Sequence, residues 1–255
     1  GGAVNGTTAN TQSLTLNAGS TGAVSVTGAV GQTTALNTLT LTHSYGATFS
    51  SPVTTGTEVV LSNTVAGQTI RFADNLTTPV LTTTANGYHL ALLGTTTSIT
   101  GTSAATMFLN TGNLVLGNAA ADTLTFAGGL TATAPSAISA AGTLGTTNAA
   151  IVLGAAPVTL TGSTVLNAGT GAITLGGTVD GAYSLVLNST GATTLAAAVG
   201  DGAALTSLTT NTGGTVVIQG AHVSTTGAQR YAEPVTLSGN TTLTGAAIRF
   251  DDTVT

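Results

Sequence analysis

Short runs in which apolar and polar residues alternate recur along the whole chain. In each run Leu, Val or Phe takes every second position and mostly Thr or Ser the positions between, as at 13–16, 24–26, 38–42, 123–126, 158–161, 184–187, 235–237 and 242–244. Alternation with a period of two turns one set of side chains inward and the other outward, which is the pattern of a half-buried β-strand. The chain is therefore expected to form short strands with Leu and Val buried and Thr facing solvent.

The segments between these runs are rich in Gly, Asn, Asp and Ser, as at 17–20, 167–169 and 238–240. Such residues supply the positive φ angles and the side-chain hydrogen bonds that tight corners require. No stretch of ten or more residues carries apolar side chains at helical spacing between a start and a stop signal. We expect a fold of strands and corners with a helix content near zero.

One sequence motif, which begins with Leu-Asn and contains Gly-Ala, occurs three times, at 16–26, 166–175 and 187–195. Gly171 and Gly191 hold the same place in the last two copies and lie 20 residues apart, at the short end of the range typical of solenoid repeats. Two further matches relate distant parts of the chain: 22–40 matches 191–209 without a gap, and 69–74 is similar to 247–252. We expect one repetitive domain over residues 1–255.

A repeat of about 20 residues, made of two or three short strands and as many corners, cannot bury its own apolar face. Stacking each coil on the one before it, at about 4.8 Å per layer, pairs every strand with its counterparts and aligns like apolar residues in columns. The sequence therefore predicts an all-β fold, a parallel β-solenoid with coils of about 20 residues. The competing fold is an antiparallel sandwich, but its hairpin signals are few: Asn5-Gly6, Asn86-Gly87, Asp180-Gly181 and Asp201-Gly202.

Composition restricts the classes of partner. Charged residues make up 4% of the chain, against roughly 25% in an average domain, and 42% of the residues are apolar. The net charge of −5 offers no basic surface for nucleic acid or anionic lipid, and no apolar stretch approaches the roughly 20 residues of a membrane-spanning helix. A surface without Lys, kept soluble by Thr, Ser, Asn and Gly, indicates an extracellular or cell-surface location.

Residues that could carry metal chemistry are few and scattered. His43, His89 and His222 have no acid or second His beside them at the spacing of metal ligands. Asp251 and Asp252 are adjacent, but a hard cation needs several converging oxygens. We expect these two side chains to be solvated carboxylates, and we expect no metal site and no cofactor.

Two pairs of carboxylates lie about one coil apart in the sequence, Asp180 with Asp201 and Glu58 with Asp74. Stacking one carboxylate over another would shift a pKa through like-charge repulsion. Glycosidase chemistry needs two carboxyl groups about 5 to 9.5 Å apart in a cleft, and the loops of this sequence are short. We therefore expect a protein that is not an enzyme, with no catalytic residues.

Two surface patterns suggest binding. The triplet Thr-Leu-Thr is typical of the flat Thr arrays of ice-binding solenoids. Such an array needs the triplet in every coil, but the copies at 40–42, 123–125, 159–161 and 242–244 are 83, 36 and 83 residues apart. The four tyrosines are too scattered for a platform that stacks sugars, and we expect them to pack in corners: Tyr45, Tyr88, Tyr183 and Tyr231. Outward Thr is expected from its β propensity alone.

The segments 191–200, 221–231 and 234–237 resemble the repeats of very large bacterial surface proteins of the filamentous-haemagglutinin and autotransporter-passenger kind. The resemblance is best over residues 160–255 and 13–42. It implies a right-handed parallel β-helix that is secreted to or across an outer membrane. It also implies a role as an adhesin stalk, a matrix component or a filament.

These features predict an extracellular structural β-solenoid that forms a stalk, filament or surface layer, with adhesion to a host surface or extracellular matrix as an associated role. A carbohydrate-binding or ligand-binding adhesin module is the alternative. Solenoids need polar caps over their terminal strand edges, and neither 1–4 nor 250–255 supplies one. The sequence predicts either a piece of a longer chain or a subunit that associates end to end, without nucleic acid or membrane insertion.

Overall fold

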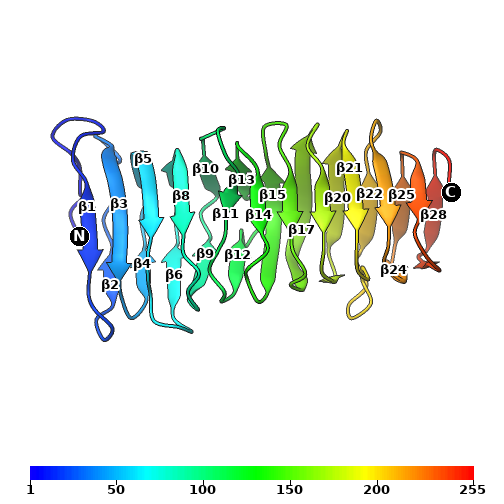
Figure 1. The fold of residues 1–255 in the computed structure, drawn as a ribbon, viewed down its shortest axis with the longest axis horizontal. Helices are drawn as coiled ribbons and strands as arrows, with labels where there is room; N and C mark the ends of the chain where they lie inside the picture. Colours follow the sequence, from blue (N-terminus) through cyan, green and yellow to red (C-terminus); the bar gives the residue numbers. More distant parts are fainter.

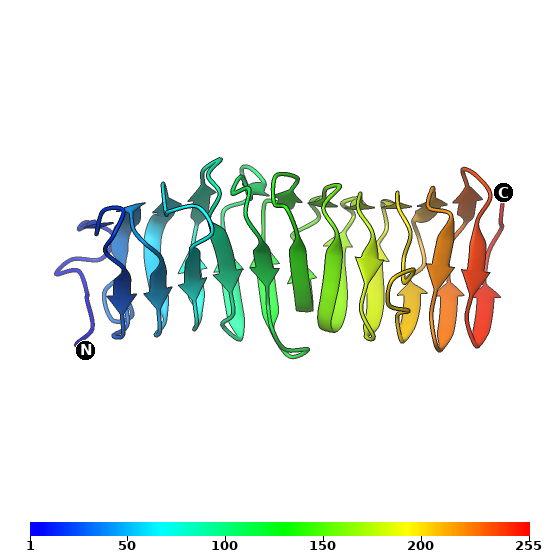
Figure 2. The same ribbon diagram turned by 90° about the horizontal axis from the view of Figure 1, so that it is seen from below.

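The computed structural model describes residues 1–255 as a rod built from β-strands alone (Figure 1). The chain winds from one end of the long axis to the other, so the termini lie at opposite ends, as the turned view in Figure 2 also shows. It makes about 11 turns of about 22 residues each, and the strands pair in parallel. The parallel β-solenoid is thus confirmed and the antiparallel sandwich is wrong. The structure contains no helix able to cross a membrane.

Each turn visits three stacks of strands, named here face A, face B and face C, in that order along the chain. Face A consists of β2 (Val24–Val26), β4 (Ala47–Phe49), β6 (Thr69–Phe72), β9 (His89–Leu92), β12 (Leu114–Leu116), β19 (Val179–Asp180), β24 (His222–Ser224) and β27 (Thr242–Thr244). Face B consists of β7 (Leu76–Thr78), β10 (Thr96–Ile99), β13 (Thr123–Phe126), β20 (Ser184–Ser189), β22 (Ser207–Thr210), β25 (Ala228–Tyr231) and β28 (Ala247–Phe250).

Face C consists of β1 (Leu14–Asn17), β8 (Val80–Thr83), β11 (Thr106–Met107), β14 (Leu130–Ala132), β16 (Ile151–Leu153), β18 (Ile173–Leu175), β21 (Ala192–Leu195), β23 (Thr215–Ile218) and β26 (Val235–Leu237). Four longer strands bend around a corner and belong to two faces. From face B to face C run β3 (Leu36–His43) and β5 (Val53–Leu61), and from face A to face B run β15 (Ile138–Gly145) and β17 (Val158–Gly169).

Inward apolar residues form columns along the rod, one residue from each turn. The column of face A runs through Val24, Ala47, Ile70, Leu90, Leu114, Ile138, Val158, Val179, Val199, Val223 and Leu243. The columns merge into one core of 47 buried residues, and burying one such side chain stabilises the fold by roughly 1.5–3 kcal/mol. All eight alternating runs of the sequence coincide with strands, which confirms the reading of their period.

Threonine departs from the outward position expected for it at ten sites. Its side chain is buried at Thr55, Thr64, Thr78, Thr83, Thr97, Thr106, Thr164, Thr193, Thr210 and Thr225. A buried hydroxyl needs a hydrogen-bond partner because it has lost water. Thr55 donates to the Thr78 hydroxyl at 2.7 Å, and Thr78 donates to the carbonyl of Val80 at 2.9 Å. The expectation that Thr faces solvent is therefore wrong at these ten sites. Most of their hydroxyls have a partner, but those of Thr97 and Thr193 are buried without one.

The turns are slightly longer than the 20 residues expected because some corners carry extra residues. Two such corners, which begin at Gly31 and Gly200, share one conformation. The two glycines have φ of +68° and +72°, and a Cβ on either would lie 2.1 Å from a backbone oxygen of the next coil. Below each corner a side-chain oxygen, from Asn5 or Asp180, accepts hydrogen bonds of 2.8–3.4 Å from two backbone N–H groups.

The sequence motif that occurs at 16–26, 166–175 and 187–195 does not occupy the same corner in all three copies. In the copies 166–175 and 187–195 it runs from face B to face C, and these copies lie directly over one another. In the copy 16–26 it runs from face C to face A. The repeat is therefore a strand–corner–strand unit, shorter than one coil, that fits more than one corner of the rod.

Candidate functional surfaces

The structure gives the paired carboxylates of the sequence separate roles. Asp180 and Asp201 belong to neighbouring turns, but the Asp180 carboxylate faces backbone N–H groups of the corner that contains Asp201. Glu58 lies on face C, where the Thr82 hydroxyl donates to it, whereas Asp74 lies in the corner between face A and face B. Asp180 thus holds a backbone corner in place, and the second pair is split between two parts of the coil.

The three histidines also lie apart. His43 ends β3 and His222 begins β24, in different regions of the rod. His89 begins β9, and its Nδ1 accepts the N–H of Asn113 from the next coil at 2.7 Å. No group of three or more His, Asp or Glu side chains is arranged to hold a metal ion.

Asp251 is exposed to solvent, as expected from the sequence, and it is also paired with two arginines. Its Oδ2 lies 2.7 Å from Nε of Arg230, and it also pairs with Arg249. The two arginines occupy the same position in β25 and β28, so they stack in successive layers, and the carboxylate between them offsets their repulsion. The hydrogen bond from Arg230, supported by Arg249, lowers the pKa of Asp251 below its ordinary value.

Glu233 is a buried carboxyl group that the alternation of the sequence does not single out. It lies in the corner between β25 and β26 with 1% of its surface exposed. Desolvation by burial raises the pKa of Glu233, and hydrogen bonds from Gly214 and Thr210 oppose this shift only in part. The chain just before it and just after it pairs with the last coil, which carries Asp251 and Asp252. The only sequence feature that could have indicated this buried position is a single acidic residue next to Pro in a corner.

Two tyrosines pack inside the rod and two are exposed. Tyr88 and Tyr231 are fully buried, and their hydroxyls donate to the Leu61 carbonyl at 3.1 Å and to Gln229 Oε1 at 3.0 Å. Tyr45 and Tyr183 are 47% and 41% exposed and lie on different corners. The expectation of corner packing therefore holds for Tyr88, which precedes β9, whereas Tyr231 is buried at the end of strand β25.

The Thr-Leu-Thr triplets do not form one array. The triplet 40–42 lies on face C, 123–125 on face B, and both 159–161 and 242–244 on face A. The hydroxyls of one triplet therefore have no second triplet in the coil above or below them. This geometry removes the regular lattice that an ice-binding surface would need.

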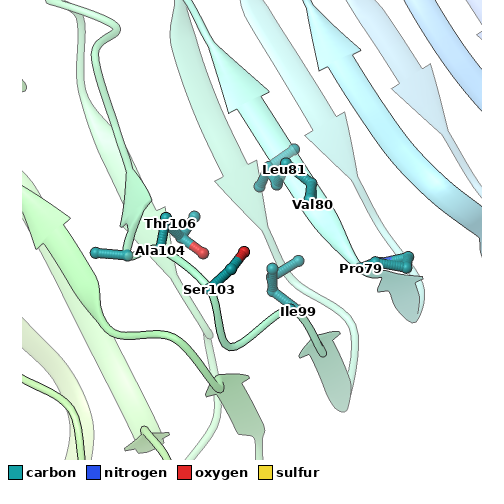
Figure 3. Close-up of a pocket in the computed structure, with 9 residues that line it drawn as sticks. Pro79, Val80, Leu81, Ile99, Ser103, Ala104 and Thr106 are labelled. Carbon is teal, nitrogen blue, oxygen red and sulfur yellow. The ribbon is translucent and has the colours of Figure 1, made fainter.

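The largest concavity lies where face C is interrupted. Strands β8 and β11 are not paired, so face C is divided into a four-stranded and a seven-stranded part. Figure 3 shows Val80 and Leu81 of β8 across from Ser103, Ala104 and Thr106, with Ile99 below. The cavity holds about 60 Å³, against roughly 300–1,000 Å³ for typical ligand pockets. It can take one or two water molecules or a methyl-sized group.

No family model matches this chain, and no match is found among curated proteins or among solved structures. The resemblance to bacterial surface repeats therefore remains a prediction from the sequence. The functional surfaces of the rod have to be judged from its own geometry.

The two ends of the rod are the surfaces where the core itself is accessible. Ile248, Phe250 and Val254 are 40%, 36% and 44% exposed, although they continue columns whose preceding members are buried. The Phe250 ring stacks on Tyr231 with centroids 5.0 Å apart, and its other side has no neighbouring coil. At the opposite end Val4 is 39% exposed. Each end thus presents apolar side chains together with unpaired strand edges.

Proposed function

We propose that this protein is an extracellular structural rod, a β-solenoid that forms a stalk, filament or surface layer and offers its surface for adhesion. One observation carries the proposal: the inward columns continue from turn to turn through the whole length of the chain. Every added turn repeats the same contacts, so length and stiffness grow together. A surface of hydroxyls and amides with 4% charged residues suits an environment outside the cell.

The proposed partner is another solenoid coil of the same kind. Unpaired strand edges readily pair with a further chain, and solenoids normally cover them. The exposed Ile248 and Val254 favour this arrangement because they are core side chains without a covering layer. We propose that each end is covered by a further coil, supplied either by a second copy that associates end to end or by the continuation of a longer chain.

Immuno-electron microscopy on cells that produce the protein tests the location and the role. We expect label at the cell surface on extended material. Label confined to the cell interior would overturn the proposal. A glycan array with monomeric protein tests the alternative of a carbohydrate-binding module. Saturable binding to one glycan class, lost when the exposed Tyr183 is replaced by Ala, would favour that alternative over a pure scaffold.

A further inference from the structure

We infer that the corner at residues 102–105 is a site of limited proteolysis for proteases that accept small side chains, and that the rod stays assembled after the cut. Hydrolysis there adds one water molecule across a peptide bond. The hydroxyl of the water goes to the carbonyl carbon of Ala104 or Ala105, the C–N bond breaks, and the remaining hydrogen goes to the nitrogen of the next residue. The site lies on the side of the rod and does not depend on what covers either end.

The backbone of this corner is free of backbone partners. Residues 102–105 join β10 to β11 and are all exposed, and none of them takes part in a backbone–backbone hydrogen bond. The last bond before the corner runs from the N–H of Gly101 to the Pro79 carbonyl at 2.9 Å, and the next runs from the N–H of Thr106 to the Gly129 carbonyl at 2.8 Å. An extended peptide is bound through its own main-chain groups, and here these groups are available.

Little holds the corner in place on either side. Toward the preceding coil lies the cavity of about 60 Å³, and Figure 3 shows Ser103 and Ala104 across it from Val80 and Leu81. Toward the following coil the Ala104 carbonyl lies against Gly128, so closely that a Cβ on this glycine would be 2.1 Å from the oxygen. Gly128 has no side chain that could cover the corner. Local opening therefore breaks few contacts, and cleavage follows the population of the open form.

The side chains of the corner select the class of protease. Its residues are Thr102, Ser103, Ala104 and Ala105, which are all small. Elastase has a small pocket for the side chain before the cut, whereas the pocket of trypsin is built for a cation. The chain has no Lys, and its three arginines, Arg71, Arg230 and Arg249, all lie in strands. The accessible corner thus fits the enzyme with the small pocket.

A second corner shows that small exposed residues are not sufficient. Residues 118–121 are also four successive exposed residues, and three of them are Ala. This corner is held by the buried Asp122, whose Oδ2 accepts the N–H groups of Asn118 at 2.8 Å and Ala119 at 2.9 Å. The N–H of Asp122 in turn donates to the Ala119 carbonyl at 3.1 Å. The two corners therefore offer similar side chains but differ in how their backbone is bound.

A cut at 102–105 leaves the two parts of the rod joined. Strands β9 and β10, before the cut, pair with β12 and β13, after it. Leu90 lies in register with Leu114 in the column of face A, and the Thr83 hydroxyl donates to the Met107 carbonyl at 3.0 Å across the cut. The new termini lie at an exposed corner, where water solvates their charges. The parts are thus held by the same ladders and columns as any two neighbouring turns.

Brief digestion of the folded protein with pancreatic elastase, followed by mass spectrometry, tests the site. Among cuts between Val30 and Val235, which leaves the end coils out of the comparison, we expect the first to follow Ala104 or Ala105. An earlier cut at another corner of this region would overturn the inference. Resistance of the region until urea unfolds the protein would overturn it as well.

Trypsin at the same molar ratio is the control for general opening of the rod. Arg71 and Arg230 lie in strands that are paired on both sides, so we expect no early cut after them. If trypsin cuts there as fast as elastase cuts its first site, the whole rod opens and the corner at 102–105 is not a distinct site.

Variants of Asp122 test whether free backbone groups decide where the cut falls. Asp122→Ala removes the acceptor of two N–H groups and is expected to add an early elastase cut at 119–121. Asp122→Asn keeps an acceptor oxygen and is expected to keep this corner intact. Circular dichroism identifies a variant that fails to fold. A folded Ala variant without the second cut would contradict the inference.

A further pair of variants leaves the buried residues unchanged. Replacing both exposed alanines, Ala104→Glu with Ala105→Glu, is expected to reduce cleavage at this corner at least tenfold while the circular dichroism stays that of the parent. The matched control, Ala119→Glu with Ala120→Glu, is expected to be cut at 104–105 as fast as the parent. Unchanged cleavage of the first variant at its altered corner would contradict selection by small side chains.

Gel filtration of the cut protein tests whether the rod stays assembled. We expect both fragments to elute together at the volume of the uncut rod and to separate only in urea. Separate elution in buffer would overturn the second half of the inference and leave the cleavage site standing.

Discussion

Glu233 of one coil accepts a hydrogen bond from the backbone N–H of Gly214 in the coil before it, with Oε2 2.9 Å from the nitrogen. The other carboxyl oxygen, Oε1, is buried without a partner. Burial removes water from a carboxylate in this position and its hydrogen bonds offset that loss only in part, so the neutral form is favoured and the pKa is raised. The contact joins two corners near the end of the rod.

The raised pKa makes stability depend on pH in a defined direction. A group whose pKa is higher in the folded state stabilises the fold fully below its unfolded value, here 4.5, and this contribution is lost as pH rises through the folded value. The urea concentration at the midpoint of unfolding is therefore expected to decrease as the pH rises from 4.5 to neutral. The Glu233→Gln variant is expected to show no such decrease. If the urea midpoint of the variant decreases with pH as steeply as that of the parent protein, Glu233 is not the group responsible.

Asp251 serves as the internal control for that titration. Its pKa is lowered by Arg230 and Arg249, so its contribution is present above the ordinary value of 3.8 and is lost only as pH falls below it. The two carboxyl groups thus act in separate pH ranges. Arg230→Ala is expected to raise the pKa of Asp251, as measured by NMR. The same variant is expected to leave the pH dependence of the urea midpoint above pH 4.5 unchanged.

Gly200 is expected to be intolerant of any side chain. Its φ is +72°, and a Cβ would lie 2.1 Å from the carbonyl oxygen of Ser224. Gly200→Ala therefore combines backbone strain with an overlap against a fixed backbone, and we expect a loss of roughly 3 kcal/mol or more in unfolding free energy.

Gly19→Ala is the matched control for this change. Gly19 has almost the same φ, +71°, but no atom lies within 4 Å of the position of a Cβ. Only the backbone term of about 1–2 kcal/mol is expected there. Equal losses for the two variants in urea unfolding would show that the overlap at Gly200 relaxes.

Thr83 joins the two parts of face C where the backbone ladder is interrupted. Its hydroxyl donates to the Met107 carbonyl at 3.0 Å and accepts the Leu109 N–H at 2.7 Å. Thr83→Val keeps the shape but leaves both backbone groups unpaired, and a loss of about 2 kcal/mol is expected.

Hydrogen exchange gives a second measurement at this break. The amide of Leu109 is expected to exchange faster in the Thr83→Val variant, with little change in the rest of the rod. Thr131→Val, an outward position on neighbouring β14, is expected to change stability by no more than about 0.5 kcal/mol. A large effect of the control would show that face C responds to any loss of a hydroxyl.

Asp180 is expected to act through its oxygen acceptor and not through its charge. Asn5 performs the same role in the equivalent corner, so Asp180→Asn should retain both backbone hydrogen bonds and nearly full stability. Asp180→Ala leaves two N–H groups unpaired and is expected to cost about 1–3 kcal/mol. If Asn and Ala variants unfold at the same urea concentration, the charge of Asp180 matters more than its hydrogen bonds.

Much of the architecture follows from short-range pattern. The run at 123–126 corresponds residue for residue to β13, and its alternation of exposed and buried side chains is the one expected. Such a run is informative because each Leu or Phe on the inward side must meet a like residue in the next coil. The column through Leu114 and Ile138 shows the result.

Other features depend on which coils meet, and no local pattern encodes them. Asp251 is exposed, as the sequence predicts, but its partner Arg230 lies 21 residues earlier in the chain and faces it across one layer. Thr55 has a polar side chain, which the sequence pattern places on the solvent side. It points inward because the Thr78 hydroxyl of the next turn is its hydrogen-bond partner. The number of residues in each corner sets these meetings, and corners of this rod vary in length.

By itself the sequence determined that the chain forms strands and corners, that the coils stack in parallel, and that Leu, Ile and Val align in columns, because a side-chain period of two and a repeat of one coil act over short distances. Only the tertiary structure decided on which face each repeat lies, which hydroxyls and carboxyls are buried, and where face C is interrupted. The physical reason is that the buried columns set the register between coils, whereas the corners take up different numbers of residues. Which residues meet across a layer therefore cannot be counted off from a fixed repeat length.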